Sequence, residues 1–247
     1  MADHGFETLG ATLKRLGVVL TDDPIPDSPE QLPGCSKCRD AGWLSRDGRA
    51  VECPCGLVAQ RRTSMIWASS QVPESMRGYS LGSFVERSGK PELADAVRAA
   101  WDGGERWLLL TGPVGVGKTG IAVSLLNEHL ASGAGGLYVV TPTMLSRIRS
   151  TYGGDADDAA TEATVMSSLI QTPLLLLDDL GKVRLTDWGQ EKLFTILNER
   201  YIEHRRTIVT SNLGASDGEL ERHVWPATFD RLIGLSDVFE IDGRSLR

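Results

Sequence analysis

The chain has 247 residues, of which 41% are hydrophobic and 24% charged, and its formal net charge is −7. This length accommodates one α/β core with a smaller appendage, and no apolar run reaches the roughly 18–20 residues that cross a bilayer. The negative charge disfavours indiscriminate binding along duplex DNA, although a local basic groove remains compatible with it. The first six residues, MADHGF, lack the features of an export signal, so we expect a cytoplasmic protein with reduced cysteines and no membrane partner.

The first predicted element is a helix at residues 6–16, because Leu9, Leu13 and Leu16 follow helical spacing. The breaker-rich run DDPIPD at residues 22–27 comes after it. A helix outside the main core indicates a partner, and packing on its own module is an equal alternative.

All four cysteines lie in one short segment, as Cys35-x-x-Cys38 and then Cys53-x-Cys55. Two close pairs of thiolates complete a tetrahedral zinc site, and residues 42–51 between them are expected to form a small hairpin. Four protein ligands leave no open position for a substrate, so the zinc is expected to be structural. Two disulfides and a redox or iron–sulfur site are the alternatives, and a reducing compartment disfavours the disulfides.

An apolar run at residues 107–110 leads into the segment GPVGVGKT, and a helical pattern follows from Ile121. Small residues let backbone N–H groups surround a β-phosphate, Lys118 adds positive charge toward the β and γ oxygens, and the Thr119 hydroxyl is a ligand for Mg²⁺. The N-terminus of the helix also favours an anion. We therefore predict a site for ATP and Mg²⁺ formed by Gly112, Pro113, Val114, Gly115, Val116, Gly117, Lys118, Thr119 and Gly120.

A second apolar strand at residues 173–177 ends in Asp178 and Asp179, at the carboxyl edge of the expected sheet. Asp178 is placed to hold the magnesium and its water shell, and Asp179 to polarise the attacking water, a task that Glu more often performs. Further strands are predicted at residues 136–140 and 206–212. Asn212, at the end of the latter, is expected to orient the water beside the γ-phosphate.

A long helix is predicted from Trp188 to His204, with a buried side made of Leu193, Phe194, Ile196, Leu197 and Tyr201. The alternation of strands and helices predicts an α/β fold with a parallel sheet covered on both faces. The Asp- and Ala-rich stretch from Gly153 to Thr164 is predicted to be a flexible or weakly helical insertion, and we assign it no function.

Together these segments resemble AAA+ ATPases of the bacterial replicative helicase loader type (DnaC or DnaI) and the related IstB-like helper ATPases of IS21-type transposons. The resemblance runs from about residue 70 to residue 247. It depends on the strings GPVGVGKT, LLLLDDLG at 174–181, EKLFTILNERY at 191–201, TIVTSNL at 207–213, FDRL at 229–232 and GRSLR at the end.

The resemblance implies an AAA+ P-loop core preceded by a small zinc module with four cysteine ligands. Lys118 and Thr119 would be its Walker A residues, Asp178 and Asp179 its Walker B pair, and Asn212 its first sensor. Three further roles follow from the resemblance alone. Arg231 would be the arginine finger and Arg247 the second sensor. The adenine contacts would be Val72, Pro73 and Tyr79. Asp230 departs from the loader pattern, where Ser often precedes the finger.

A finger acting in trans couples ATP binding to subunit assembly. The resemblance therefore implies an ATP-dependent loader of the replicative DNA helicase, which assembles into a ring or spiral on single-stranded DNA and releases it after hydrolysis. Residues 1–63 would bind the partner and residues 64–247 would form the ATPase domain. Expected contacts to the strand are Arg147, Arg149, Lys182 and Arg184. A transposition helper, a small P-loop phosphotransferase and a nucleotide-gated adaptor with little turnover stay open as alternatives.

Overall fold

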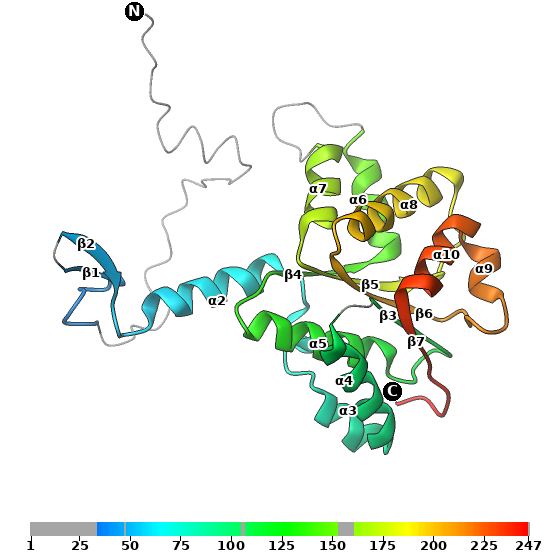
Figure 1. The fold of residues 1–247 in the computed structure, drawn as a ribbon, viewed down its shortest axis with the longest axis horizontal. Helices are drawn as coiled ribbons and strands as arrows, with labels where there is room; N and C mark the ends of the chain where they lie inside the picture. The colour runs from blue at the N-terminus through cyan, green and yellow to red at the C-terminus, as the bar shows by residue number, and fades with distance from the viewer. Residues whose placement is uncertain (1–33, 47, 105–106, 153–160, 247) are drawn as a thin grey trace, which may run out of the picture.

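A computed structural model describes residues 34–46, 48–104, 107–152 and 161–246 (Figure 1). The helix predicted at residues 6–16 and the terminal Arg247 lie outside these ranges. Within them, a small hairpin module leads through helix α2 (Leu57–Ser69) into an α/β domain.

The α/β domain is built on five parallel strands in the order β4-β5-β6-β3-β7. The strands are β3 (Trp107–Thr111), β4 (Gly136–Val140), β5 (Leu174–Leu180), β6 (Arg206–Ser211) and β7 (Ser236–Glu240). The parallel sheet expected from the apolar runs is confirmed. Strand β7 was not predicted from the sequence, because its sequence SDVFE has two acidic residues and too few apolar residues to indicate a strand.

Helices cover both faces of this sheet (Figure 1). One face packs against α3 (Leu81–Ser88), α4 (Pro91–Gly103) and α5 (Lys118–Ala131). The other packs against α6 (Thr141–Ser150), α7 (Glu162–Gln171), α8 (Asp187–Ile202), α9 (Glu219–His223) and α10 (Pro226–Leu235). Alternate residues of each strand enter the two cores, as Leu108 and Leu109 do in β3.

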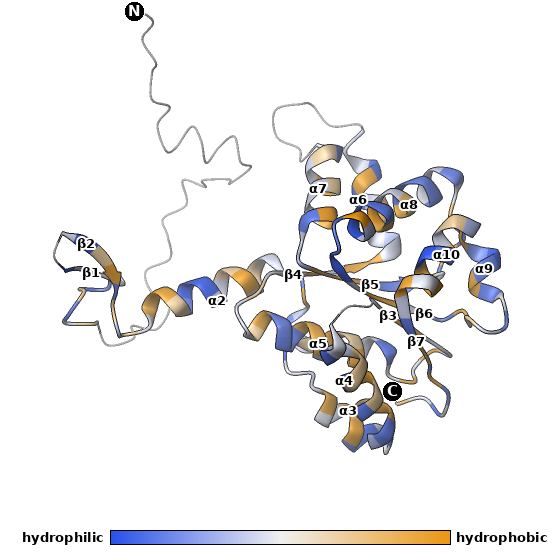
Figure 2. Ribbon diagram, in the orientation of Figure 1, coloured by the Kyte–Doolittle hydropathy of each residue, from blue (hydrophilic) through white to orange (hydrophobic). Residues whose placement is uncertain are grey.

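The distribution of hydropathy follows this layering, since the strands are mainly hydrophobic and the helices carry both hydrophobic and hydrophilic stretches (Figure 2). None of the helices in the described part of the chain combines the length and apolar character of a bilayer-spanning segment.

Of the insertion predicted from Gly153 to Thr164, the structure describes only the last four residues. The Thr161 hydroxyl accepts a hydrogen bond from the Thr164 N–H at 3.3 Å and caps the start of α7. The end of the insertion is therefore the beginning of an ordinary helix.

The helix predicted from Trp188 to His204 is α8, and its buried side differs at two positions. Leu193, Ile196 and Leu197 are fully buried. Phe194 is only partly buried and Tyr201 is 44% exposed, so the assignment of Tyr201 to the buried side was wrong. The residue that completes the stripe at i, i+3, i+4 and i+7 is Arg200, which is also fully buried. Position 200 was not predicted to be buried, because the prediction counted only apolar residues and this residue is an arginine.

Arg200 ties α8 to the end of α7. Its guanidinium donates hydrogen bonds to the backbone carbonyl groups of Leu169, Ile170, Thr172 and Arg206. The first three belong to the last turn of α7 and its exit, where carbonyls lack partners within the helix. Burial, and then the nearby charge of Arg205, lowers the pKa of Arg200 to about 9, so the side chain stays charged at neutral pH.

Arg200→Met is expected to lower the free energy of unfolding by about 2–4 kcal/mol, because it leaves buried carbonyl groups without donors. Urea unfolding of the full chain measures this change. Arg205→Gln is the matched control, since the Arg205 guanidinium donates to the Gln171 carbonyl at an exposed position, and it should cost less than about 1 kcal/mol. Equal costs for the two variants would contradict the role given to Arg200.

Candidate nucleotide and metal sites

The loop between β3 and α5 takes a path that only glycine permits at two positions. Gly112 has a φ of 131°, and a Cβ atom there would collide with the backbone oxygen of Ile241. Gly117 has a φ of 105°, and its Cβ would lie 2.6 Å from the Phe84 ring. The loop is therefore held closely between α3 and the C-terminal segment, as a phosphate-binding loop requires.

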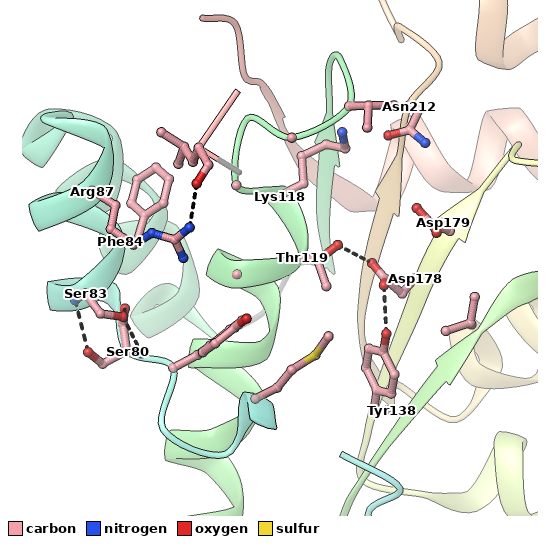
Figure 3. A pocket seen from close by; sticks show the side chains of 18 of the residues that line it. Ser80, Ser83, Phe84, Arg87, Lys118, Thr119, Tyr138, Asp178, Asp179 and Asn212 are labelled. Atoms are coloured by element: carbon pink, nitrogen blue, oxygen red, sulfur yellow. Dashed lines mark hydrogen bonds between the residues drawn. The ribbon is translucent and has the colours of Figure 1, made fainter. Parts of the chain in front are cut away.

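This loop borders a pocket of about 550 Å³ that opens between α3, α5 and the carboxyl ends of β4 and β5 (Figure 3). Ten residues predicted from the sequence line it: Tyr79, Val114, Gly115, Gly117, Lys118, Thr119, Gly120, Asp178, Asp179 and Asn212. Of the other predicted loop residues, Val116 is buried in the core, and Gly112 and Pro113 contact the Lys118 side chain through their carbonyl oxygens. Residues far apart in the sequence thus meet at one site.

The side chain of Lys118 is held in place by backbone carbonyl groups of the same loop. Its ammonium donates hydrogen bonds to the Gly112 and Pro113 carbonyl oxygens, at 2.6 and 2.7 Å, and the residue is only 5% exposed. Phosphate oxygens entering the pocket would compete for this ammonium with stronger, charged acceptors.

Asp178 is 3% exposed, and both of its carboxylate oxygens accept hydrogen bonds. Thr119 donates to Oδ1 and Tyr138 donates to Oδ2, both at 2.9 Å (Figure 3). Thr210 also donates to Oδ1, at 2.5 Å. The Thr119 hydroxyl and the Asp178 carboxylate therefore lie side by side at the wall of the pocket. Hydroxyl and carboxylate oxygens are ligands that Mg²⁺ prefers, so this pair fits the expected magnesium site.

Tyr138 is a site residue that the sequence reasoning missed. Burial, and to a smaller degree the charge of Asp178, raises the pKa of Tyr138 above its usual range, so the hydroxyl remains a donor. Tyr138→Phe should reduce ATP turnover at limiting Mg²⁺ about tenfold, since partners of metal-binding carboxylates tune metal affinity. Turnover measured against Mg²⁺ concentration tests this, with the exposed Tyr201→Phe as control. Identical Mg²⁺ dependence in both variants would contradict it.

Asp179 enters the pocket through a bulge in β5. The register of β5 against β6 shifts between Leu177 and Leu180, and Asp179 has a φ of 57°. Its backbone N–H donates to the Thr210 hydroxyl at 3.0 Å, which fixes the bulge. Asp tolerates the left-handed region better than most residues, which gives a physical reason for Asp where Glu more often stands.

The segment before α3 forms the far wall of the pocket. The side-chain amide of Asn127 in α5 donates to the backbone oxygens of Met76, Arg77 and Tyr79, which fastens this segment to the domain. Tyr79 lines the pocket as expected, whereas Val72 is a core residue with 3% exposure and Pro73 precedes a short 3-10 helix (Glu74–Met76). The adenine contacts stay a prediction.

Helix α3 contributes a wall that the sequence reasoning did not foresee. Ser80 and Ser83 cap its start reciprocally, and this capping pattern, followed by Phe84, was an available signal. The pocket residues that were missed are Met76, Ser80, Ser83, Phe84, Arg87, Tyr138, Val140, Lys182 and Leu246.

The C-terminal segment after β7 closes the loop side of the pocket. The Leu246 N–H donates to the Gly115 carbonyl at 2.9 Å, and Arg87 of α3 donates to the Leu246 carbonyl at 2.5 Å. The segment therefore brings Leu246 to the phosphate-binding loop. The second-sensor role of Arg247 stays a prediction, because that residue is outside the described ranges.

Arg231 lies on α10 and does not line the pocket. Its guanidinium donates to the Asn198 side-chain oxygen at 2.6 Å and lies 4.9 Å from the centre of the Phe194 ring, both on α8. The side chain is thus held in a defined position on the outer side of the domain. Its role as a finger toward a neighbouring subunit remains a prediction.

The residues expected to contact a nucleic acid strand fall into two groups. Arg147, Arg149 and Arg184 are exposed, and the Arg149 guanidinium lies 4.7 Å from the centre of the Trp188 ring. Trp188 also meets the exposed Tyr152 edge to face, with ring centres 6.1 Å apart. Lys182, in contrast, lines the nucleotide pocket.

The cysteine module folds around its four sulfur atoms. The hairpin expected between the two pairs is present as β1 (Trp43–Arg46) and β2 (Arg49–Glu52). The four Sγ atoms lie within 4.8 Å of one another, with Cys35 to Cys53 at 3.8 Å and Cys38 to Cys55 at 3.7 Å. Metal–sulfur bonds of about 2.3 Å in a tetrahedron place sulfurs about 3.8 Å apart, so this cluster fits a zinc ion.

The same separations exclude disulfides in this structure, because a disulfide needs about 2.05 Å between sulfurs. Backbone N–H groups of Cys38 and then Lys37 lower the pKa of the Cys35 thiol to about 7, whereas burial and hydrogen bonds with the other three thiols raise the pKa of Cys53. The geometry of the four sulfur atoms, rather than these opposed shifts, therefore supports a metal site. Zinc as the ion remains a prediction.

Helix α2 joins the cysteine module to the core. Near its start, Arg61 donates to the Asp40 carbonyl of the module at 3.1 Å. Near its end, Ile66 and Trp67 pack against the hydrophobic core. The predicted domain boundary between residues 63 and 64 falls inside this helix.

Comparison with known proteins places the α/β domain in one family. The family model described as IstB-like ATP binding protein matches residues 59–247. The phage-like element PBSX protein XkdC of Bacillus subtilis is 26% identical over 231 residues, covering 86% of this chain and 84% of that protein. The replicative helicase loader DnaI of Bacillus subtilis is 23% identical over 254 residues, covering 88% and 80%.

Insertion-sequence relatives match a shorter region. The ATP-binding protein of insertion sequence IS1162 from Pseudomonas fluorescens is 33% identical over 126 residues, covering 51% of this chain and 52% of that protein, so the match spans about half of each. Among solved structures, DnaI superposes with a TM-score of 0.59 at 24% identity, covering 76% of this chain and 100% of that one. The DnaC helicase loader superposes with a TM-score of 0.57 at 21% identity, covering 69% of this chain and 100% of that one. At these identities the structures show a shared fold.

Proposed function

Since the chain belongs to the family of IstB-like ATP-binding proteins and has the AAA+ P-loop fold, we propose that it is an Mg²⁺-dependent ATPase that loads a replicative DNA helicase in the cytoplasm. The observation that carries the ATPase activity is the meeting of Lys118, Thr119, Asp178, Asp179 and Asn212 around one pocket.

In the proposed hydrolysis, loop N–H groups and Lys118 bind the phosphates, and Thr119 and Asp178 would hold Mg²⁺. When bound, Mg²⁺ neutralises charge on the β- and γ-phosphate oxygens. Asn212 orients a water molecule and Asp179 accepts its proton as the water oxygen bonds to the γ-phosphorus. The bond from that phosphorus to the β-phosphate oxygen breaks, and ADP and phosphate leave.

The extent of the sequence matches supports a loader over a transposition helper. The family match at residues 59–247 begins after the cysteine module, whereas the DnaI match covers 88% of the chain and so extends into the N-terminal region. The IS1162 match covers 51%. We therefore assign helicase docking to the N-terminal module, with a structural zinc ion bound by Cys35, Cys38, Cys53 and Cys55.

We further infer that subunits assemble into a ring or spiral on single-stranded DNA. Arg231 would reach the γ-phosphate of a neighbouring subunit, since it is held on the outer side of the domain. The exposed Arg149 and Tyr152, together with the partly buried Trp188 between them, offer a cation and aromatic surface of the kind on which bases stack.

The helicase proposal is tested by mixing the full-length protein with the replicative helicase of its host on a sizing column with light scattering. The mixture is run with ATP, with ADP and without nucleotide. A complex that weakens with Trp43→Ala, an exposed position of the hairpin, but not with Tyr152→Ala, would support docking through the module. Absence of a complex under every condition would favour the transposition helper, with a transposase and DNA as partners.

A further inference from the structure

Lys182 contacts the residue that we propose as the base. It lies on the turn that leaves β5 and lines the same pocket as Lys118, Thr119 and Asn212. Its ammonium nitrogen lies 2.8 Å from Oδ2 of Asp179, and its backbone N–H donates to the Asp179 carbonyl at 3.3 Å. One of the two carboxylate oxygens of Asp179 is therefore already engaged by a cation.

The two partners of this contact differ in how firmly they are held. Asp179 is fixed at the bulge by its φ of 57° and by the hydrogen bond from its N–H to Thr210. Its side chain is 24% exposed, whereas that of Lys182 is 56% exposed and has a long flexible stem. A change at this contact would therefore move the lysine more than the aspartate.

The contact opposes the chemistry proposed for Asp179. A carboxylate that takes a proton from water needs an oxygen directed at that water, and an ammonium at hydrogen-bond distance competes for this oxygen. A γ-phosphate in the pocket carries more negative charge than one carboxylate and attracts the same ammonium. Lys118 offers a parallel, since its ammonium also rests on oxygens of the protein at the place where phosphates are expected.

We propose that Lys182 is a positioning residue that restrains Asp179 and slows hydrolysis until bound nucleotide or subunit assembly draws its ammonium away. This inference rests on the proposed ATPase activity. It assigns Lys182 to control of the ATP site rather than to contact with a nucleic acid strand.

The test compares steady-state ATP turnover of the full-length wild-type protein with that of Lys182→Met. Arg222→Gln is the matched control, because it removes an exposed cation on α9 that does not line the pocket. Lys182→Met should raise kcat about two- to fivefold, as expected for loss of a partly exposed ion pair, and leave KM for ATP unchanged. Arg222→Gln should behave like wild type. An unchanged thermal unfolding midpoint would show that the fold is intact.

A second arm asks whether the effect passes through Asp179. In an Asp179→Asn background, Lys182→Met should no longer raise turnover. A lower or unchanged kcat in Lys182→Met, with wild-type protein active, would overturn the inference and leave the proposed function standing. Inactivity of wild type, Lys182→Met and Arg222→Gln alike would overturn the proposed ATPase as well. Activity that appears only in Lys182→Met would support a complete restraint.

Discussion

Asp179→Asn is expected to lower kcat for ATP hydrolysis by about 10²–10⁴-fold while ATP still binds. The amide preserves the size of the side chain and tolerates the left-handed backbone at the bulge, but it is not a base. The phosphate loop, Thr119 and Asp178 are unchanged by the substitution. The variant should therefore accumulate as an ATP-bound assembly. Light scattering measures the size of the assembly, and an assay of phosphate release measures the loss of hydrolysis.

Asp95→Asn is a suitable control, because Asp95 is exposed on α4 and does not line the pocket. It should retain wild-type turnover. A wild-type protein with negligible turnover, and an Asp179→Asn variant that forms the same assemblies, would identify a nucleotide-gated adaptor instead. A small P-loop phosphotransferase would differ from both by transferring the γ-phosphate to an acceptor other than water.

Removal of the metal is expected to unfold the cysteine module while the ATP site survives. Within the described part of the module, residues 34–46 and 48–56, the buried side chains are Cys38 and Cys53, and β2 is exposed along its whole length. So small a core does not stabilise a hairpin, and structural zinc contributes about 10–16 kcal/mol of apparent binding free energy. Cys53→Ser or a strong chelator should therefore abolish the module's fold.

Metal analysis of the purified protein should find one zinc ion per chain in wild type and little in Cys53→Ser. Limited proteolysis should then cut residues 34–56 in the variant and spare the α/β domain, which should still bind ATP. Ser45→Ala is the control, because Ser45 is an exposed hairpin residue outside the cysteine cluster. This variant should resist proteolysis as the wild type does. Iron in place of zinc, or a module that resists proteolysis without metal, would contradict the prediction.

The parts of the site that the sequence predicts are those with strong local signals. The strand, glycine-rich loop and helix around Lys118 are contiguous, and the acidic pair follows an uninterrupted apolar strand, so parallel-sheet topology alone brings them together. Tyr138 carries no such signal. It belongs to a short strand whose tyrosine reads as a core residue, and only pairing of β4 with β5 places its hydroxyl at Asp178.

The positions of two other residues could not be predicted from local sequence patterns. Arg200 occupies a core position that the apolar pattern assigned to its neighbour, because its charge is satisfied by carbonyls distant in sequence. Lys182 reads as a surface cation after a strand, and its position in the pocket depends on the turn that follows the bulge. In both cases the function of the side chain depends on a tertiary partner.

Helix α2 separates the cysteine module from the α/β domain by a fixed length (Figure 1). It is one continuous helix of 13 residues, which corresponds to a length of about 20 Å. Its inner end packs beside the core, next to the segment that continues into the pocket wall at Met76 and Tyr79. A tilt of about 10° at that end would sweep the hairpin through roughly 3–4 Å, so a sub-ångström adjustment around a nucleotide would be magnified at the far end.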